Sequence, residues 1–302
     1  MQYALAIDEA ASETALGSTA RRPAKPFGSQ LLKWVGNKQR FAPEIISFFP
    51  ERFGTYHEPF LGAGGVLGVL APRRAEAADC FAPLIGIWQQ LKKDPEVLKS
   101  WYAERWDEFQ RGDKVSRYER IKARYNAGAN PMDLLFLCRA CYGGVVRFRM
   151  RDGHMSTPCG VHSPIHPAAF GRRVDEWRRR VSGTRFFHRE YAESLKRVRE
   201  GDVVYCDPPY SFSQAILYGA QNFSLDALFV ALEGAKRRGA FVALSIDGSK
   251  KSGADRCEIK VPEKLFAREI CVRVGRSMLK RFQMTGKSLE CEVVTDRLYL
   301  SH

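Results

Sequence analysis

Several features are missing from this sequence, and each absence excludes a class of protein. No apolar run approaches the ~20 residues that a membrane-spanning helix needs, so we expect no membrane association. The opening residues MQYALAIDEA lack a basic segment followed by an apolar core, which argues against a secretory or mitochondrial leader. With 45% hydrophobic and 27% charged residues, the composition is also far from that of a disordered chain.

The eight cysteines are scattered and form neither a disulfide framework nor a metal site. Cys138 and Cys141 make one CxxC, but it lies within the helix-like stretch DLLFLCRACYGG. No second CxxC and no suitably spaced histidine pair completes a zinc site. We therefore predict buried cysteines, no bound metal, and reduced thiols in a cytoplasmic setting.

Lysine is missing from the middle of the chain, where arginine is frequent. The formal net charge is +14, which suits a polyanionic partner such as nucleic acid. Between Arg139 and Arg189 every basic side chain other than histidine is arginine, whose planar fork binds phosphate and guanine edges bidentately. Arg147 and Arg149, which follow a glycine pair, are predicted to contact nucleic acid. For the run of arginines at 178–180, a solvated helix face is an equally good interpretation.

Strand and helix patterns alternate along much of the chain. The stretch FGTYHEPF indicates a strand, GAGG a tight loop and VLGVLA a helix start, and a short strand then ends near Asp79. Later, GDVVYC and AFVALSID indicate buried strands on either side of a helix capped by Ser224. The closing segment CEVVTDRLYL indicates a last strand, antiparallel to the others. This order predicts an α/β fold with a mostly parallel sheet covered by helices on both faces.

The sharpest motif is Asp-Pro-Pro-Tyr at 207–210, directly after the apolar strand VVYC. Two prolines remove two backbone donors and fix the direction of the chain at the edge where open α/β sheets bind ligands. A carboxylate, a proline carbonyl and an aromatic ring are thereby held around a pocket that suits a planar amine. The alternative interpretation is a plain turn that ends a strand.

A second motif, Pro-Phe-Leu-Gly-Ala-Gly-Gly at 59–65, also follows a strand. Its glycines allow close approach to a ligand, and Asp79 at the end of the next strand is placed to accept hydrogen bonds from ribose hydroxyls. Leu67 stands where the dinucleotide fingerprint GxGxxG needs its third glycine, which argues against an oxidoreductase. An exposed turn carboxylate remains the simpler interpretation of Asp79.

These motifs together resemble those of one enzyme family. LKWVGNK at 32–38, PFLGAGG and DPPY occur in the order of the motifs KWxGxK, FxGxG and DPPY of Dam-type (D12 class, alpha group) DNA N6-adenine methyltransferases. Residues 132–160 resemble part of the family's recognition domain, and the similarity covers roughly residues 31–300. The resemblance implies a Rossmann-like S-adenosylmethionine-dependent methyltransferase sheet with an inserted, mainly helical target-recognition domain.

The resemblance also implies a division of the chain and a set of site residues. We expect a flexible leader at 1–27, a catalytic domain at 28–82 and 184–302, and a target-recognition domain at 83–183. With S-adenosylmethionine as cofactor, the expected cofactor-binding residues are Trp34, Lys38, Phe60, Gly62, Gly64, Asp79 and Asp207. The expected catalytic residues are Asp207, Pro208 and Tyr210, and the expected DNA-binding residues are Lys122, Arg139, Tyr142, Arg147 and Arg149.

By the same resemblance, Asp207 and the Pro208 carbonyl accept the N6 hydrogens of an adenine flipped out of double-stranded DNA, while Tyr210 stacks on the base. We expect a monomer, and the resemblance allows a cognate restriction endonuclease that acts separately. The chain departs from the family at Phe81, where asparagine is common, and at Glu190-Tyr191, where Asp-Phe is common. The recognition sequence therefore cannot be assumed to be GATC. An N4-cytosine or RNA amine target and a catalytically dead DNA-binding relic remain alternatives.

Overall fold

The computed structural model describes most of the chain. The described residues are 19–20, 27–209, 223–247, 249–250, 255–256, 261–262, 264–275 and 294–302. Tyr210 lies outside them, so its stacking role stays a prediction. Of the predicted leader, strand β1 (Thr19–Ala20) pairs with β2 (Arg52–Phe53), and Phe27 is buried. The remainder of residues 1–27 lies outside the described part of the chain.

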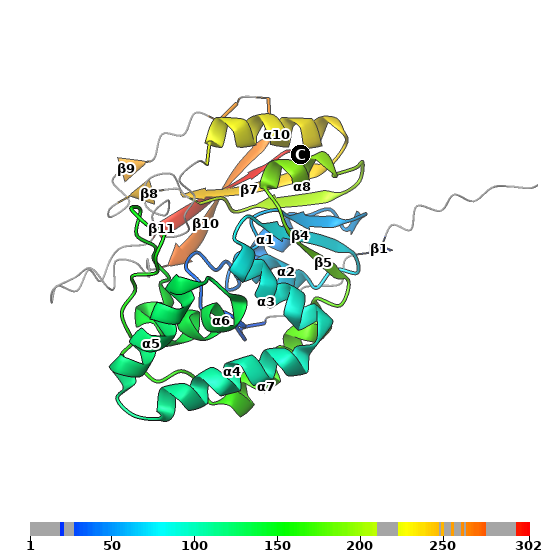
Figure 1. Ribbon diagram of the computed structural model, residues 1–302. Helices are drawn as coiled ribbons and strands as arrows, with labels where there is room; N and C mark the ends of the chain where they lie inside the picture. Colours follow the sequence, from blue (N-terminus) through cyan, green and yellow to red (C-terminus); the bar gives the residue numbers. More distant parts are fainter. Residues whose placement is uncertain are drawn as a thin grey trace, which may run out of the picture.

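A seven-stranded sheet forms the centre of the molecule, in the order β10-β11-β7-β6-β3-β4-β5 (Figure 1). The five neighbouring strands β7-β6-β3-β4-β5 run parallel to one another. Strand β11 is antiparallel to both of its neighbours, β7 and β10. This confirms the predicted α/β sheet and its antiparallel last strand. The strands are β3 (Tyr56–Glu58), β4 (Ala75–Asp79), β5 (Thr184–His188), β6 (Val203–Cys206), β7 (Phe241–Asp247), β10 (Arg268–Gly275) and β11 (Val294–Leu300). A separate short pair joins β8 (Ser249–Lys250) and β9 (Asp255–Arg256).

Helices cover both faces of the sheet (Figure 1). On one face lie α8 (Tyr191–Lys196) and α10 (Leu225–Arg237), and on the other lie α1 (Ala42–Ser47), α2 (Gly65–Leu70) and α3 (Ala82–Lys93). Side chains of β6 alternate between the two faces, with Tyr205 in the larger core and Cys206 in the smaller one. Because both faces are buried, β6 reads as a continuous apolar run, VVYC. No helix among the described residues combines the length and apolar character needed to cross a bilayer.

The segment between β4 and β5 is mainly helical and lies on the α3 side of the sheet (Figure 1). It comprises α3, α4 (Pro95–Gln110), α5 (Lys114–Ala127), α6 (Pro131–Ala140), the 3₁₀ turn η1 (Tyr142–Gly144) and α7 (Pro167–Arg180). Helix α3 packs against β4 and β5 as well as against α4 and α6, so it belongs to the sheet's cover and to the insert at once. The boundaries of a recognition domain at 83–183 stay a prediction.

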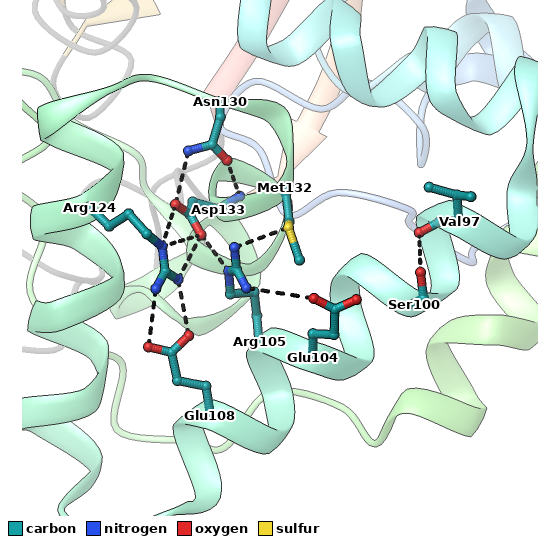
Figure 2. Close-up of polar contacts among 9 residues, drawn as sticks. All are labelled: Val97, Ser100, Glu104, Arg105, Glu108, Arg124, Asn130, Met132 and Asp133. Carbon is teal, nitrogen blue, oxygen red and sulfur yellow. Dashed lines mark hydrogen bonds and ion pairs between the residues drawn. The ribbon is translucent and has the colours of Figure 1, made fainter.

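One buried carboxylate joins three helices of the insert (Figure 2). Asp133 on α6 is fully buried and accepts hydrogen bonds from Arg105 on α4 and from Arg124 on α5, whose Nη2 lies 2.9 Å from Oδ1. Asn130, the N-cap of α6, donates to Oδ2 at 2.9 Å, and Glu108 pairs with Arg124 at 3.0 Å. Burial alone would raise the pKa of Asp133, but these donors outweigh it and hold the pKa below its usual range.

We predict that Asp133→Asn destabilises the protein by on the order of 3 kcal/mol at neutral pH, because two guanidinium groups lose their buried counter-charge. The native pKa lies below the unfolded one, so this stabilisation is present above about pH 4 and is lost as the pH falls through the native pKa. Urea unfolding from pH 7 to pH 3 measures both effects.

The matched control is Asp175→Asn on α7. It removes the charge of a half-exposed carboxylate that pairs with Lys99 on α4. Its cost should stay below about 1 kcal/mol, as for other surface pairs. Equal destabilisation by the two substitutions would mean that the buried network does not hold the helices together.

Candidate functional site

A cavity of about 320 Å³ opens at the carboxyl edge of the sheet. The chain leaves β3 toward β4 on one side and later returns as β6 on the other, so this edge contains the topological switch point at which open α/β sheets bind ligands. The lining comes from segments far apart in sequence: Trp34–Lys38, Glu58, Phe60–Ala63, Gly65–Val66, Asp79–Phe81, Glu190–Tyr191, Tyr205, Asp207–Pro209 and Phe223. Gly64, which was predicted to bind the cofactor, is not among the lining residues. All three motifs singled out in the sequence therefore meet at one cavity, although Tyr210 itself is not described.

The glycine loop after β3 forms one wall of the cavity. Gly62 and Gly64 have φ values of +48° and +63°, a left-handed conformation that only glycine adopts without strain. The loop is fastened at two points, because Leu61 N–H donates to the Ala78 carbonyl and the Trp88 indole donates to the Gly62 carbonyl at 3.1 Å. A rigid turn thus presents its backbone to the cavity, as predicted for a ligand-binding loop.

Asp79, at the end of β4, accepts a hydrogen bond from the glycine loop and so holds it in place. Its Oδ2 accepts the Gly62 N–H at 3.0 Å, and its Oδ1 accepts the Phe81 N–H at 3.1 Å. Burial raises the pKa of Asp79, while these two backbone donors oppose the rise. A carboxylate oxygen can accept more than one hydrogen bond, so Asp79 can position the loop and still bind a hydroxyl group at the cavity.

Lys38 and Asp207 form an ion pair across the cavity. The Lys38 Nζ lies 2.8 Å from both carboxylate oxygens of Asp207, and both side chains are largely buried. Asp207 follows β6, and Pro208 and Pro209 continue the lining next to it. The lysine fixes the orientation of the carboxylate, and the two prolines fix the backbone that carries it.

Glu58, the last residue of β3, lies on the cavity floor and was not selected from the sequence. Its Oε2 accepts hydrogen bonds from the Tyr56 hydroxyl at 2.7 Å and from the Leu67 N–H at 3.0 Å. Burial raises the pKa of Glu58 to about 8, so the side chain is mostly a neutral acid at pH 7. The only signal in the sequence was a carboxylate at the end of an apolar strand, the same pattern that drew attention to Asp79.

Aromatic side chains form another wall of the cavity. Phe60 stacks on Tyr191 with ring centroids 5.2 Å apart, and Phe223 meets Phe60 edge to face at 5.8 Å. Trp34 packs near Phe81, with ring centroids 6.2 Å apart, and both residues also line the cavity. Phe60 and Trp34 were predicted to bind a cofactor, whereas Phe223 was missed and Tyr191 was noted only as a departure from the family pattern.

The segment from Cys141 to Gly160, called here the 141–160 hairpin, follows α6. Two antiparallel bridges, Cys141 with Cys159 and Phe148 with Met155, define its two arms. The first arm is the longer, and its extra length is taken up by η1, where Gly143 has a φ of +64°. The Thr157 hydroxyl ties the arms together by accepting the Arg147 N–H and donating to the Val145 carbonyl.

Two of the five residues predicted to contact DNA, Arg139 and Lys122, are buried or paired within the protein. Arg139 is 3% exposed, and its Nη1 donates to the carbonyls of Gln30 and Leu31. The prediction that Arg139 contacts DNA is wrong for this structure, because helix α6 directs it into the core and not to the surface. Lys122 is half-buried on α5 and is paired with Glu119 at 2.7 Å.

The other three lie on the hairpin. Tyr142 is 38% exposed, unusually open for a large aromatic side chain. Arg149 is paired with Asp152 at 2.8 Å near the tip of the hairpin. The Arg147 guanidinium is half-buried and has no ionic or hydrogen-bonding partner among the described residues. The roles of Tyr142, Arg147 and Arg149 in DNA binding stay predictions.

Comparison with known proteins identifies the family. The sequence model of the D12 class N6 adenine-specific DNA methyltransferases matches residues 34–236, more than half of the 302 residues. The chain belongs to this family. The resemblance found in the motifs is thereby confirmed, and the observed sheet is that of a Rossmann-like methyltransferase.

Curated relatives match over different lengths. A Type II methyltransferase of Lactococcus lactis subsp. cremoris is 27% identical over 59% of this chain and 64% of the relative. A DNA adenine methylase of Vibrio cholerae is 28% identical over 71% of this chain and 79% of the relative. The DNA N-6-adenine-methyltransferase of Escherichia phage P1 is 25% identical, and the match covers 31% of that longer protein. The names of the Vibrio cholerae and phage P1 relatives describe adenine methylation by those proteins.

The buried Glu58 should make the stability of the protein depend on pH. Because the native pKa of Glu58 is about 8 and its unfolded pKa is near 4.5, its contribution to stability is complete below about pH 4.5 and is lost as the pH rises through 8. Glu58→Gln mimics the neutral acid. Between pH 7 and pH 9 the wild type should lose about 1 kcal/mol more stability than Glu58→Gln. Chemical unfolding at the two pH values measures this, and parallel losses would show that Glu58 ionises normally.

Proposed function

We propose that this chain is a site-specific enzyme that methylates N6 of an adenine in double-stranded DNA, with S-adenosylmethionine as the methyl donor. The observation that carries the proposal is a single cavity in which the glycine loop and Asp79 face the Lys38–Asp207 ion pair. In such an arrangement, a nucleotide-like cofactor and a planar amine can bind in adjoining positions. The family description and the names of the Vibrio cholerae and phage P1 relatives support this substrate.

The residues of the cavity fit a cationic cofactor. Its ionisable lining comprises the acids Glu58, Asp79, Glu190 and Asp207 and, on the basic side, Lys38. S-Adenosylmethionine carries a sulfonium, an ammonium and a carboxylate group. The ionised acids of the lining favour its net positive charge, whereas Glu58, neutral near pH 7, adds no charge. The volume of about 320 Å³ lies within the range of small-molecule sites.

Each part of the cofactor has candidate partners. The glycine loop and Lys38 would hold the methionyl end of the cofactor, and Asp79 would accept its ribose hydroxyls. The stacked pair Phe60 and Tyr191 offers an apolar wall for the adenine ring. Oε2 of Glu58 already accepts two hydrogen bonds, whereas Oε1 has no hydrogen-bond partner among the residues that the structure describes. Oε1 can therefore accept from or donate to a polar group in the cavity.

When bound, the cofactor supplies an electrophilic methyl group on its sulfonium sulfur. Asp207 then has the central role among the protein groups, since its carboxylate accepts a hydrogen of the target amine and directs the nitrogen lone pair at the methyl carbon. Lys38 keeps that carboxylate in one orientation, and Pro208 contributes a backbone carbonyl with no competing N–H donor at Pro209. Catalysis rests on positioning and on preorganised electrostatics.

The DNA side of the proposal rests on charge and exposure. An adenine inside the duplex cannot reach the cavity and must be flipped out, which costs a few kcal/mol. We assign to DNA contact the exposed Tyr142 and also Arg147, whose guanidinium has no partner in the described part of the chain. The net charge of +14 favours the phosphate backbone. A monomer suffices for this reaction, and the Type II relative supports a restriction endonuclease that acts separately.

Cofactor binding gives the first test. Asp79→Ala removes the acceptor for Gly62 and for the ribose at once, so the dissociation constant for S-adenosylmethionine should rise at least about tenfold. Isothermal titration calorimetry measures it, and Asp107→Ala, an exposed change on α4, should leave it unchanged. Wild-type affinity in Asp79→Ala would remove Asp79 from the cofactor site.

Methyl transfer gives the decisive test. Incubation with tritiated S-adenosylmethionine and mixed-sequence duplex DNA, followed by digestion to nucleosides, should yield labelled N6-methyladenine. Asp207→Asn keeps the shape of the side chain but loses the charge that Lys38 orients, so the transfer rate should fall on the order of 100-fold or more. Labelled N4-methylcytosine would correct the substrate, and full activity of Asp207→Asn would refute the mechanism.

A further inference from the structure

Two cysteines lie opposite each other at the base of the 141–160 hairpin. Cys141 and Cys159 form an antiparallel bridge, flanked by hydrogen bonds from Tyr142 N to Pro158 O at 2.9 Å and from Gly160 N to Ala140 O at 2.8 Å. Bonds placed on either side of the pair define a non-hydrogen-bonded position, in which Cα atoms lie ~4.5 Å apart and side chains share one face. Disulfides span Cα separations of roughly 4.4–6.8 Å, so the backbone already has the required spacing.

Both thiols are reduced in this structure, and their different exposure determines which of them reacts first. Cys159 is half-buried and reachable from solvent, whereas Cys141 is buried behind it. Each thiol donates a hydrogen bond to a backbone carbonyl, that of Gly160 for Cys159 and that of Cys138 for Cys141. Cys138, the other thiol nearby, is fully buried and donates to the Leu135 carbonyl of its own helix at 3.2 Å, which turns it away from the hairpin.

We propose that Cys141 and Cys159 form a reversible disulfide that locks the base of the hairpin to the end of α6. The oxidant is a low-molecular-weight disulfide such as oxidised glutathione. The Cys159 thiolate attacks one glutathione sulfur, releases the other glutathione as a thiolate and forms a mixed disulfide. The Cys141 thiolate then attacks the Cys159 sulfur and releases the second glutathione. Two protein thiols lose two protons and two electrons, which reduce one oxidised glutathione to two glutathione molecules.

The disulfide would change how the hairpin is held. With both thiols reduced, two backbone hydrogen bonds close the base of the arms that carry Tyr142 and Arg147. A covalent bond at that point removes the open conformations of the base and leaves the tip unchanged. The consequence for DNA rests on the function proposed above: a hairpin ordered in advance loses less entropy on binding, so the cross-linked protein should bind duplex DNA about three- to tenfold more tightly.

Peptide mapping tests the disulfide directly. Trypsin separates the three thiols, because Cys138 falls in the peptide 125–139, Cys141 in 140–147 and Cys159 in 152–172. The full chain is incubated with oxidised glutathione at pH 8.5, since burial raises the pKa of both thiols and slows exchange at neutral pH. Free thiols are then alkylated and the digest is analysed by mass spectrometry.

The expected product joins peptides 140–147 and 152–172, and dithiothreitol should separate them. Cys159→Ser should abolish this product, whereas Cys271→Ser, a change at an exposed cysteine of β10, should leave it in full yield. A link between peptides 125–139 and 140–147, or complete alkylation of all three thiols, would overturn the proposal.

DNA binding is measured by fluorescence anisotropy on the same oxidised and reduced samples, with calorimetric S-adenosylmethionine affinity as a reference that should not change. A lower dissociation constant for DNA after oxidation, absent in Cys159→Ser, supports the coupling to the hairpin. Equal dissociation constants in a sample whose disulfide is mapped would overturn that coupling. If neither redox state binds DNA, the proposed function fails while the mapped disulfide stands.

Discussion

The parallel pairing of β3 with β6 is the constraint on which the rest of the site depends. Tyr56 and His57 pair with Val203 and Val204, strands separated in the chain by the whole helical insert. Because the two strands run in the same direction, their carboxyl ends meet at one edge of the sheet. Glu58 with the glycine loop and Asp207 with its two prolines are therefore held side by side. A change in this register would separate the two halves of the cavity.

More acidic than basic side chains lie at that edge of the sheet. The structure compensates each acidic side chain in a different way. Asp207 is compensated by Lys38, Asp79 by two backbone N–H groups, and Glu58 by remaining protonated near pH 7. Three different solutions keep three carboxyl groups in a small volume without mutual repulsion. The surrounding fold holds these compensated groups in place, and the result is a cavity with preorganised hydrogen-bonding groups.

The insert follows a different principle, because its rigidity comes from polar contacts as well as from packing. Asp133 joins α4, α5 and α6 through two arginines, and this core carries the 141–160 hairpin at the end of α6. The hairpin is held by backbone bonds, by the Thr157 hydroxyl and by α5, where Asn126 exchanges two hydrogen bonds with Met155 and the Tyr118 hydroxyl donates to the Thr157 carbonyl. The hairpin is therefore anchored to the helical core, and the paired cysteines lie where it joins α6.

Local patterns in the sequence were enough to predict the alternation of strands and helices, the glycine loop, the position of Asp79 and the approximate place of DPPY. These features depend on short backbone segments whose preferences are local. Tertiary structure alone decided which side chains meet. Arg139 looked like a DNA contact but is buried, Glu58 was passed over but lies on the cavity floor, and Lys38 reaches Asp207 across 169 positions of sequence. Burial and pairing of a long charged side chain depend on what packs over it from distant parts of the chain, and no local pattern contains that information.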